Sequence, residues 1–153
     1  SRLRRKIGFE EVSGRGIEIF LADSPKASRV NASVESEDLV QASDLRDLVN
    51  TLFFSEAKAI AINGKRILPH TSIDAIGDSF FLGDARISPP FLITAIGEPE
   101  ELSSKIRDQT LLPNFLPRVK QRGIEFRPQR KETLTIPAFT GKMTTKFLAP
   151  ETK

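Results

Sequence analysis

The stretch from Ser43 to Ile67 constrains the fold more than any other part of the chain. Its first half places apolar residues three and four positions apart, which gives a helix one apolar side. These residues are Leu45, Leu48, Val49, Leu52 and Phe53. Ser43 is placed to cap the first free amides, and Asp44 and Asp47 lie near the positive end of the helix dipole. The pattern predicts a helix that is capped by Ser43 and faces the core.

The second half of this stretch predicts a hairpin. Ala59 to Ile62 is a short apolar run, and Asn63-Gly64 follows it directly. Asn-Gly is the pair that most easily adopts the positive φ angles of a two-residue hairpin turn. We therefore expect a strand, a tight turn and a return strand that begins at Lys65.

Upstream of the helix, the sequence predicts a second hairpin and a loop. Two β-prone runs, Ile7 to Val12 and Ile17 to Leu21, flank the Gly-rich segment Ser13-Gly14-Arg15-Gly16. A Gly-rich connection between such runs is typical of a hairpin. Residues 22–38 are polar and have no sustained period, which predicts an exposed, flexible loop.

Downstream of the central hairpin, the pattern is mostly β. Pro69 interrupts it, which predicts a bent edge strand over Ser72 to Gly77. Another hairpin is expected around Gly83. The longest apolar run, Phe91 to Ile96, is typical of a strand at the centre of a sheet.

The last third of the chain predicts two short helices and an edge strand. Pro99 suits the first position of a helix that runs to about Asp108. A third helix is expected to end at Gly123. Its inward-facing residues are Phe115, Leu116 and Val119. The strand that follows contains Pro128, which makes it an edge strand or ends it, and Leu134 to Ile136 resumes the β pattern.

These elements predict a single α+β domain of ferredoxin-like type. In that two-layer sandwich, a mainly antiparallel sheet carries helices on one face, here with an extra N-terminal hairpin. With 153 residues, of which 39% are hydrophobic, the chain is long enough to bury a core. We expect a basic lead-in and first strand over residues 1–12, the domain over 13–138 with its flexible loop at 22–38, and a loose tail over 139–153.

Few residues suit catalysis or metal binding. The chain has no cysteine, which excludes disulfides, thiol nucleophiles and cysteine metal sites. His70 is the single histidine, and no nucleophile-elbow motif surrounds any serine. Asp74, Asp78 and Asp84 lack the alternating ligands of a calcium loop. We expect no catalytic residue, no cofactor and no metal site.

The charges are distributed unevenly. Residues 1–117 contain 14 Lys and Arg against 17 Asp and Glu, whereas residues 118–153 contain 9 against 3. The densest basic group is Arg118, Lys120, Arg122, Arg127, Arg130 and Lys131. Anionic lipid headgroups, an acidic partner and a merely solvated face all suit this group. Nucleic acid is disfavoured because only Phe126 is interleaved, at a position typical of a buried side chain.

A second polar group lies on the central hairpin. Asn63, Lys65 and Arg66 either form a rim that faces a partner or serve the register and solubility of the hairpin. The sequence has no apolar run of about 18 residues that would span a membrane, and no signal-peptide core.

Several motifs resemble a bacterial family of unknown function that is often labelled "division initiation protein". They are Asn50-Thr51-Leu52, the segment Ala57 to Ile67 with its Ala-Ile-Ala-Ile-Asn-Gly core, Ser72-Ile73, and the strand Pro89 to Pro99. The resemblance covers residues 14–138. It departs at Phe53-Phe54-Ser55, where the family has a small, Gly-containing connection, and at Ile73-Asp74.

The resemblance implies a membrane-anchored protein without catalytic activity. It implies a single membrane helix and a coiled-coil spacer upstream of Ser1, with this domain outside the cytoplasmic membrane. The expected function is a non-enzymatic protein-interaction or scaffold domain of the bacterial envelope, linked to cell division. The expected partners are other envelope proteins, or a second copy bound through the upstream segment. The alternative is a module that binds anionic ligands, polyanions or lipid headgroups through the basic group.

Overall fold

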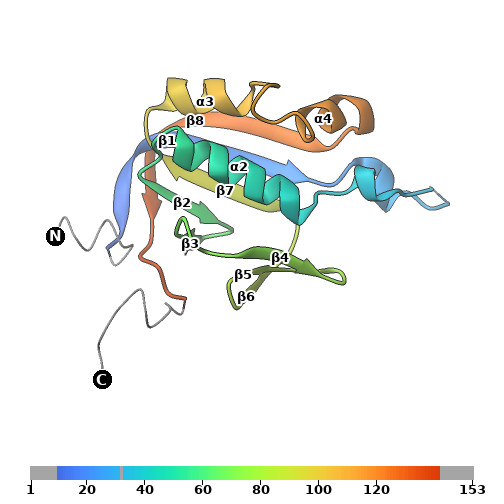
Figure 1. Ribbon diagram of the computed structural model, residues 1–153, viewed down its shortest axis with the longest axis horizontal. Helices are drawn as coiled ribbons and strands as arrows, with labels where there is room; N and C mark the ends of the chain where they lie inside the picture. Colours follow the sequence, from blue (N-terminus) through green and yellow to red (C-terminus); the bar gives the residue numbers. More distant parts are fainter. Residues whose placement is uncertain (1–9, 32, 142–153) are drawn as a thin grey trace.

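The fold is built on a five-stranded antiparallel sheet in the order β3-β2-β7-β1-β8, with a separate three-stranded sheet β4-β5-β6 (Figure 1). The computed structural model describes residues 10–31 and 33–141. The strands are β1 (Val12–Ala22), β2 (Ala59–Ile62), β3 (Lys65–Ile67), β4 (Ile73–Ile76), β5 (Ser79–Leu82), β6 (Ala85–Ile87), β7 (Phe91–Ile96) and β8 (Glu125–Ile136). The helices are α2 (Ala42–Phe54), α3 (Pro99–Ile106), α4 (Leu116–Arg122) and the 3-10 turns η1 (Pro25–Ser28) and η2 (Ser36–Asp38).

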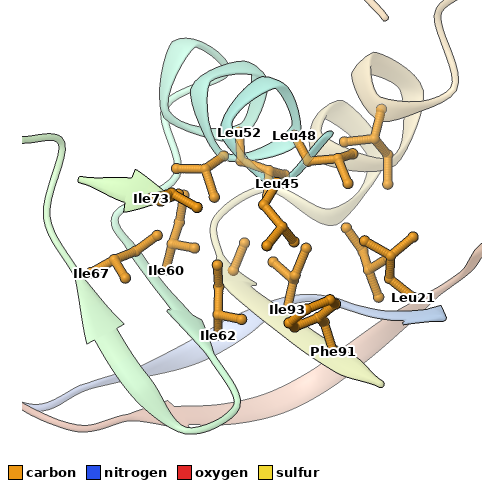
Figure 2. Packing of buried hydrophobic residues seen from close by; sticks show 14 of the residues in the cluster. Leu21, Leu45, Leu48, Leu52, Ile60, Ile62, Ile67, Ile73, Phe91 and Ile93 are labelled. Atoms are coloured by element: carbon orange, nitrogen blue, oxygen red, sulfur yellow. The ribbon is translucent and has the colours of Figure 1, made fainter. Parts of the chain in front are cut away.

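Helix α2 packs its predicted apolar side on the sheet. Leu45, Leu48 and Leu52 point from the helix toward the strands, where Ile60 and Ile93 lie beneath them (Figure 2). All five side chains are fully buried. Buried apolar surface on this scale is the main source of stability for a domain of this size.

The prediction that Ser43 caps this helix is wrong by two residues. The helix begins at Ala42, and Gln41 is the capping residue. The backbone N–H of Gln41 donates to Asp44 Oδ2 at 2.8 Å, which is the reciprocal half of a capping box. The position of Asp44 at the third residue of the helix therefore decides where the helix begins.

The predicted N-terminal hairpin is also wrong. The segment Ser13-Gly14-Arg15-Gly16 lies inside the single strand β1, whose pairing with β8 shifts register between Gly14 and Gly16. A Cβ atom on Gly16 would lie 1.9 Å from the carbonyl oxygen of Ala95 in β7. Glycine is required here because two strands approach closely. Residues 7–9 of the expected first strand, Ile7 to Val12, lie outside the described residues, and Val12 begins β1.

The central hairpin and the central strand are confirmed. Residues Ile60, Ala61 and Ile62 pair with Ile67, Arg66 and Lys65. Asn63 and Gly64 have φ angles of 51° and 78°, which are the left-handed values that the turn requires. β7 lies in the middle of the five-stranded sheet, between β2 and β1.

The predicted edge strand over Ser72 to Gly77 is confirmed: it is β4 (Ile73–Ile76), which lies at an edge of the second sheet. β4, β5 and β6 form an antiparallel meander, and Ile73, Leu82 and Ile87 from it are buried in the main core. Phe80 of β5 meets Phe91 of β7 edge to face, with ring centroids 5.0 Å apart. The meander thus closes one end of the core.

The C-terminal elements follow their predictions closely. α3 begins at Pro99, α4 is closed by Gly123 at a φ of 80°, and the N–H of Gly123 donates to the carbonyl of Val119. Phe115 is buried and meets Phe126 of β8 edge to face. β8 runs without interruption through Pro128, which an edge strand tolerates because one side of it needs no pairing.

The loop predicted over residues 22–38 is more structured than its polarity suggests. It contains η1 and η2, and it buries the side chains of Ser24 and Asp38. The prediction of an exposed segment is therefore wrong for these two residues. Residues 1–9 of the predicted lead-in and first strand (1–12) and residues 142–153 of the predicted tail (139–153) lie outside the described residues.

The architecture is α+β, with antiparallel sheets and the helices α2 and α3 packed on one face of the larger sheet. Alternate residues of the strands point to the other face. At the end where β1 begins and β8 ends, that other face carries a smaller apolar cluster of Ala59, Ala61, Ile96 and Ile136.

Candidate functional site

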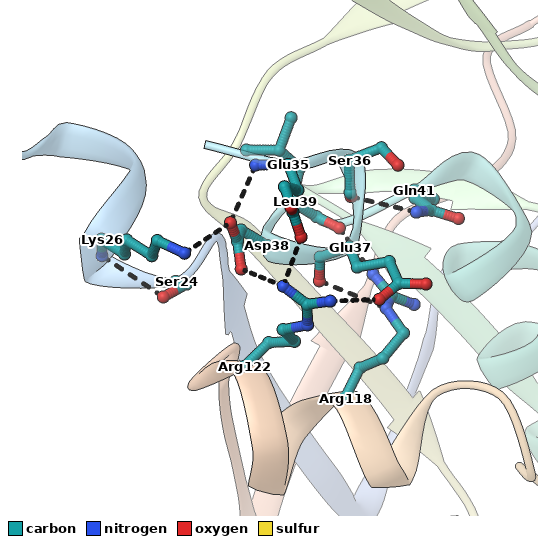
Figure 3. A network of polar contacts seen from close by, with 10 residues as sticks. All are labelled: Ser24, Lys26, Glu35, Ser36, Glu37, Asp38, Leu39, Gln41, Arg118 and Arg122. Carbon is teal, nitrogen blue, oxygen red and sulfur yellow. Dashed lines mark hydrogen bonds and ion pairs between the residues drawn. The ribbon is translucent and has the colours of Figure 1, made fainter. Parts of the chain in front are cut away.

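A network of ion pairs and hydrogen bonds joins the loop before α2 to helix α4 (Figure 3). Arg122 pairs with Glu35 at 2.7 Å, with Glu37 at 2.6 Å and with Asp38 at 3.5 Å. Lys26 reaches the other oxygen of Asp38 at 3.4 Å. We call these contacts, together with those of Arg118, the loop latch.

Arg118 makes the most buried contacts of the loop latch. It donates to Asp44 Oδ1 at 2.7 Å and to the carbonyl oxygen of Leu39 at 2.6 Å. Its side chain is 13% exposed, and that of Asp44 is 2% exposed. The pair joins α4 to the start of α2, so the basic residues of α4 hold the fold together.

Asp38 gives the loop latch a pH dependence. Its carboxylate accepts the backbone N–H of Glu35 at 2.9 Å, and this hydrogen bond, aided by Lys26 and Arg122 and opposed by burial, holds the pKa of Asp38 below its ordinary value. A carboxylate with a lowered pKa stabilises the folded state fully above its ordinary pKa of about 3.9, and that contribution is lost as the pH falls through the lower value.

We therefore expect Asp38→Asn to lower the midpoint of urea denaturation at pH 7. The difference in midpoint between the two proteins should narrow as the pH falls below about 4. Both proteins share other carboxylates with a shifted pKa, and the effects of these cancel in the difference between the two midpoints. Burial raises the pKa of Asp47, and the hydroxyl of Thr110 lowers the pKa of Asp108. Urea denaturation at a series of pH values measures this difference. A difference in midpoint that stays constant from pH 7 to about pH 3 would contradict stabilisation of the fold by the ionised Asp38 carboxylate.

The predicted basic group is divided among different surfaces. Arg130 pairs with Glu100 of α3 at 2.7 Å, on the side of the sheet that the helices cover. Arg127 pairs with Glu125 at 3.1 Å and Lys131 with Glu18 at 3.6 Å, on the opposite side. Lys120 is exposed on α4. The group thus forms no continuous basic strip, and five of its six members contact carboxylates.

The polar residues of the central hairpin have mainly structural roles. Asn63 accepts the N–H of Leu92 at 2.7 Å and donates to the carbonyl of Ser88 at 3.1 Å, so it fastens the turn to the start of β7. Lys65 is exposed. Asn63 and Lys65 are the two members of the predicted rim that reach the surface.

Arg66 does not belong to an exposed rim, because it is 5% exposed. It donates to the carbonyl oxygens of Glu10 at 3.0 Å and Pro137 at 3.1 Å, and burial lowers its pKa. It therefore fastens the segments just before β1 and just after β8 to the hairpin.

The helix-free side of the larger sheet presents an apolar surface that the sequence analysis missed. Phe20 of β1 is paired in register with Leu92 of β7, and Leu92 is 39% exposed. The guanidinium of Arg127 lies 4.6 Å from the centre of the Phe20 ring. A hollow of about 420 Å³ lies beside Phe20. We call this surface the open face and define it by Glu18, Phe20, Leu92, Glu125, Arg127 and Lys131.

In the sequence, the only signal for the open face is a polar residue within each of two apolar runs, Glu18 in the first and Thr94 in the second. In Ile17 to Leu21, Glu18 and Phe20 alternate with three isoleucine and leucine residues that are fully buried. In β7, Leu92 and Thr94 alternate in the same way with buried residues. A strand with both faces covered would not show this difference in burial.

A second hollow, of about 820 Å³, lies at the end of the sheet where α2 ends and α3 begins. Phe54, which is 77% exposed, is among its lining residues, so this hollow lies where the sequence departs from the family pattern. Arg15 pairs with Glu98 at 2.7 Å and Lys105 with Glu101 at 3.7 Å. Because both signs of charge are present, the lining favours no ligand of one charge.

Metal and membrane features were sought in the part of the chain that the structure describes. Across residues 10–31 and 33–141, no group of three or more His, Cys, Asp and Glu side chains is arranged to hold a metal ion. Among the same residues, none of the helices combines the length and the apolar composition needed to cross a bilayer.

Comparison with protein families gives one match over nearly the whole chain. The family model described as a bacterial protein of unknown function, DUF881, matches residues 1–149. The chain belongs to the DUF881 family. This agrees with the resemblance to a bacterial family of unknown function that the motifs suggested.

Two relatives of the chain have names that assign no function. The UPF0749 protein YlxW of Bacillus subtilis is 32% identical over 104 residues, which are 66% of this chain and 43% of YlxW. The UPF0749 protein Rv1823 of Mycobacterium tuberculosis is 32% identical over 96 residues, which are 60% of this chain and 31% of that protein. The chain therefore spans less than half the length of these relatives.

A solved structure supports the fold. The crystal structure of an uncharacterized conserved protein from Mycobacterium tuberculosis superposes with a TM-score of 0.72 over 97% of this chain and 96% of that one, at 21% identity. At this identity the likeness concerns the fold alone. The two chains therefore share this α+β architecture.

Proposed function

We propose that this domain is a non-enzymatic protein-interaction module of a bacterial envelope protein and that the open face is its binding surface. The observation that carries the proposal is the apolar pair Phe20 and Leu92 on the helix-free side of the sheet, of which Leu92 is 39% exposed and Phe20 is half-buried. An apolar patch bordered by charged residues is typical of a site where another protein binds.

The edges of the sheet are less suited to binding. β3 is only the three residues Lys65–Ile67, and β8 contains Pro128 and an irregular pairing with β1. Short strands, prolines and bulges are the features that keep sheet edges from pairing with other chains. A partner is therefore expected on a face of the sheet rather than at an edge.

The proposal includes a ferredoxin-like topology for the larger sheet. The connections β1-α2-β2 and β7-α3-α4-β8 each leave one strand between the two strands that they join. This split β-α-β arrangement is that of ferredoxin-like folds, with β3 and the β4-β6 meander as additions. In such a two-layer fold one face of the sheet has no helices. The open face lies on that side.

Anchoring in the membrane, a location outside it and a link to cell division are proposed from the family resemblance alone. Protease added to cells whose outer layers are permeabilised, but whose cytoplasmic membrane is intact, should cut the full-length protein within this domain. Full protection of the domain, with a cytoplasmic control also protected, would place it inside and contradict the proposal.

The anionic-ligand alternative has weaker support. Arg127 and Lys131, the members of the basic group on the open face, are each paired with a carboxylate. A polyanion would have to displace these pairs before it gained any contact. We therefore retain protein interaction as the proposed function.

A pair of leucines offers a matched test in living bacteria. Leu92 on the open face and Leu111 between α3 and α4 are 39% and 37% exposed. A photo-reactive amino acid is placed at one of these positions in the full-length protein. At position 92 we expect a discrete cross-linked product, which Phe20→Asp should remove. At position 111 we expect no such product. Identical patterns at both positions, or none at 92, would contradict the use of the open face.

A further inference from the structure

We propose that the paired start of β1 and end of β8 form a flap that opens and closes on the helix-free side of the larger sheet, with Arg66 as its latch. The flap consists of residues 12–14 and 134–136, whose pairs are Val12 with Ile136, Ser13 with Thr135 and Gly14 with Leu134. It lies at the opposite end of the sheet from Phe20 and Leu92, so its opening does not require a partner at the open face.

The flap has little support from the rest of the sheet. Among the described strands, only β1 and β8 take part in it, because the pairing of β1 with β7 begins at Gly16. A two-stranded ribbon is at best marginally stable by itself. On the exposed side of the flap, the hydroxyl oxygens of Ser13 and Thr135 share a hydrogen bond of 3.0 Å. This bond joins the two strands, so they move as one unit.

The flap meets the rest of the sheet at a bend. The pairing of β1 with β8 shifts register between Gly14 and Gly16, and irregularities of this kind bend the strands that contain them. In Figure 1 the start of β1 and the end of β8 turn together away from the direction of the other strands. Ser13, Gly14 and Arg15 line the hollow of about 820 Å³, so there is space beside the bend. Residues 14–16 thus have the features of a hinge.

The closed flap covers a small apolar cluster. Its inward side chains are Val12, Leu134 and Ile136, and against them lie Ala59, Ala61 and Ile96. In the sheet order β7 and β1 lie between β2 and β8, yet Ile136 of β8 packs with two alanines of β2. The end of β8 therefore folds over the face of the sheet. Because two of the three covered side chains are alanines, the sheet contributes little apolar surface to the closed state.

Arg66 fastens the closed flap at its outer end. It donates to the carbonyl oxygens of Glu10 and Pro137, which lie two residues before β1 and one residue after β8. Both hydrogen bonds come from Nη1, and in the described part of the chain the buried Nε has no acceptor. A buried donor without a partner costs free energy that exposure to water recovers. The latch is therefore weaker than a fully paired guanidinium.

Opening uncovers Ala59, Ala61 and Ile96 on the same side of the sheet as the open face. The uncovered side chains would enlarge the apolar surface that a partner can bind. This use of the opened flap rests on the proposed function, whereas the opening itself does not.

Thiol labelling of the 153-residue chain tests the opening, since the chain has no native cysteine. Ala61→Cys places a thiol beneath the flap and Val49→Cys places one in the main core, at positions that are 1% and 4% exposed. Without urea, we expect Ala61→Cys to react at least about tenfold faster than Val49→Cys. Below the unfolding transition, urea should hardly change the Ala61→Cys rate, because flap opening exposes little surface, and should raise the Val49→Cys rate steeply.

Equal rates at the two positions, with the same dependence on urea, would mean that only global unfolding exposes Ala61 and would overturn the flap. Ala59→Cys is a second reporter, since Ala59 is 1% exposed in the same cluster, and it should behave like Ala61→Cys. Slow, steeply urea-dependent labelling of both reporters would likewise overturn the flap.

The latch is tested in the Ala61→Cys chain. Arg66→Met removes both hydrogen bonds and should raise the labelling rate by about tenfold, still with little dependence on urea. Lys65→Met replaces the exposed neighbour of Arg66 and should leave the rate unchanged. Equal rates in these two variants would overturn the role of Arg66. The purified chain contains no partner, so loss of the cross-link at position 92 would contradict the proposed function without affecting these results.

Discussion

Replacing Gly16 with alanine is expected to destabilise the fold by about 3 kcal/mol or more. The added Cβ would lie 1.9 Å from the carbonyl oxygen of Ala95 and 2.9 Å from the Cα atom of Ile96. Both atoms belong to the backbone of β7, the central strand, so no flexible side chain can move to make room. Relief requires β1 and β7 to separate, which breaks pairing in the middle of the sheet.

Urea unfolding of Gly16→Ala beside Gly83→Ala separates this clash from ordinary glycine effects. Gly83 has a φ of 61°, and its Cβ position has open space around it. Its replacement should cost only the strain of a left-handed alanine, about 1 kcal/mol. If Gly16→Ala is no more destabilising than Gly83→Ala, β1 and β7 do not approach as closely as described.

The second large effect is expected from Arg118→Met, which should lower the free energy of unfolding by about 3 kcal/mol. The change leaves the carboxylate of Asp44, which is 2% exposed, without its cation. It also leaves the carbonyl of Leu39 without the guanidinium donor. An uncompensated buried charge is among the most costly defects that a single substitution can introduce.

Two comparisons isolate the buried pair. Arg130→Met removes a cation from the same basic group, but Arg130 and its partner Glu100 are 58% and 67% exposed, so its cost should stay below about 1 kcal/mol. The double variant Asp44→Asn/Arg118→Met should be more stable than the sum of its single changes predicts, by about 1 to 3 kcal/mol. Equal costs for Arg118→Met and Arg130→Met would contradict the assignment of Arg118 to a buried contact.

Elements with strong local signals could be predicted from the sequence. The apolar period of α2, the Asn63-Gly64 turn, the proline at the start of α3 and the glycine at the end of α4 each act within a few residues. Local preference and final structure agree at these points because the tertiary contacts reinforce the same conformation.

The predictions that were wrong concern features that depend on contacts between distant parts of the chain. Gly14 and Gly16 look like a turn in isolation, whereas the neighbouring strand β7 decides that they lie within a strand. Arg66 is ordinarily a surface residue type, and its burial follows from the carbonyls of Glu10 and Pro137, which lie far away in the sequence. No local pattern contains that information.

The candidate site shows the same division. The basic residues were identified correctly by type, but the alternation of β8 sends Arg127 and Lys131 to one side of the sheet and Arg130 to the other. The partners of Arg118 and Arg122 lie in the loop before α2 and at the start of α2, so their structural role needed the tertiary fold. The pairing of Phe20 with Leu92 likewise required the strand order.

Oxidative footprinting of the full-length protein in native membranes, compared with the purified 153-residue chain at low concentration, tests the central claim most directly. Several apolar side chains are exposed, among them Leu92, Phe54, Ile76 and Leu111. We expect the oxidation of Phe20 and Leu92 to fall in membranes while that of Phe54, Ile76 and Leu111 stays the same. Unchanged oxidation of Phe20 and Leu92, or protection confined to the other three side chains, would contradict a binding role for the open face.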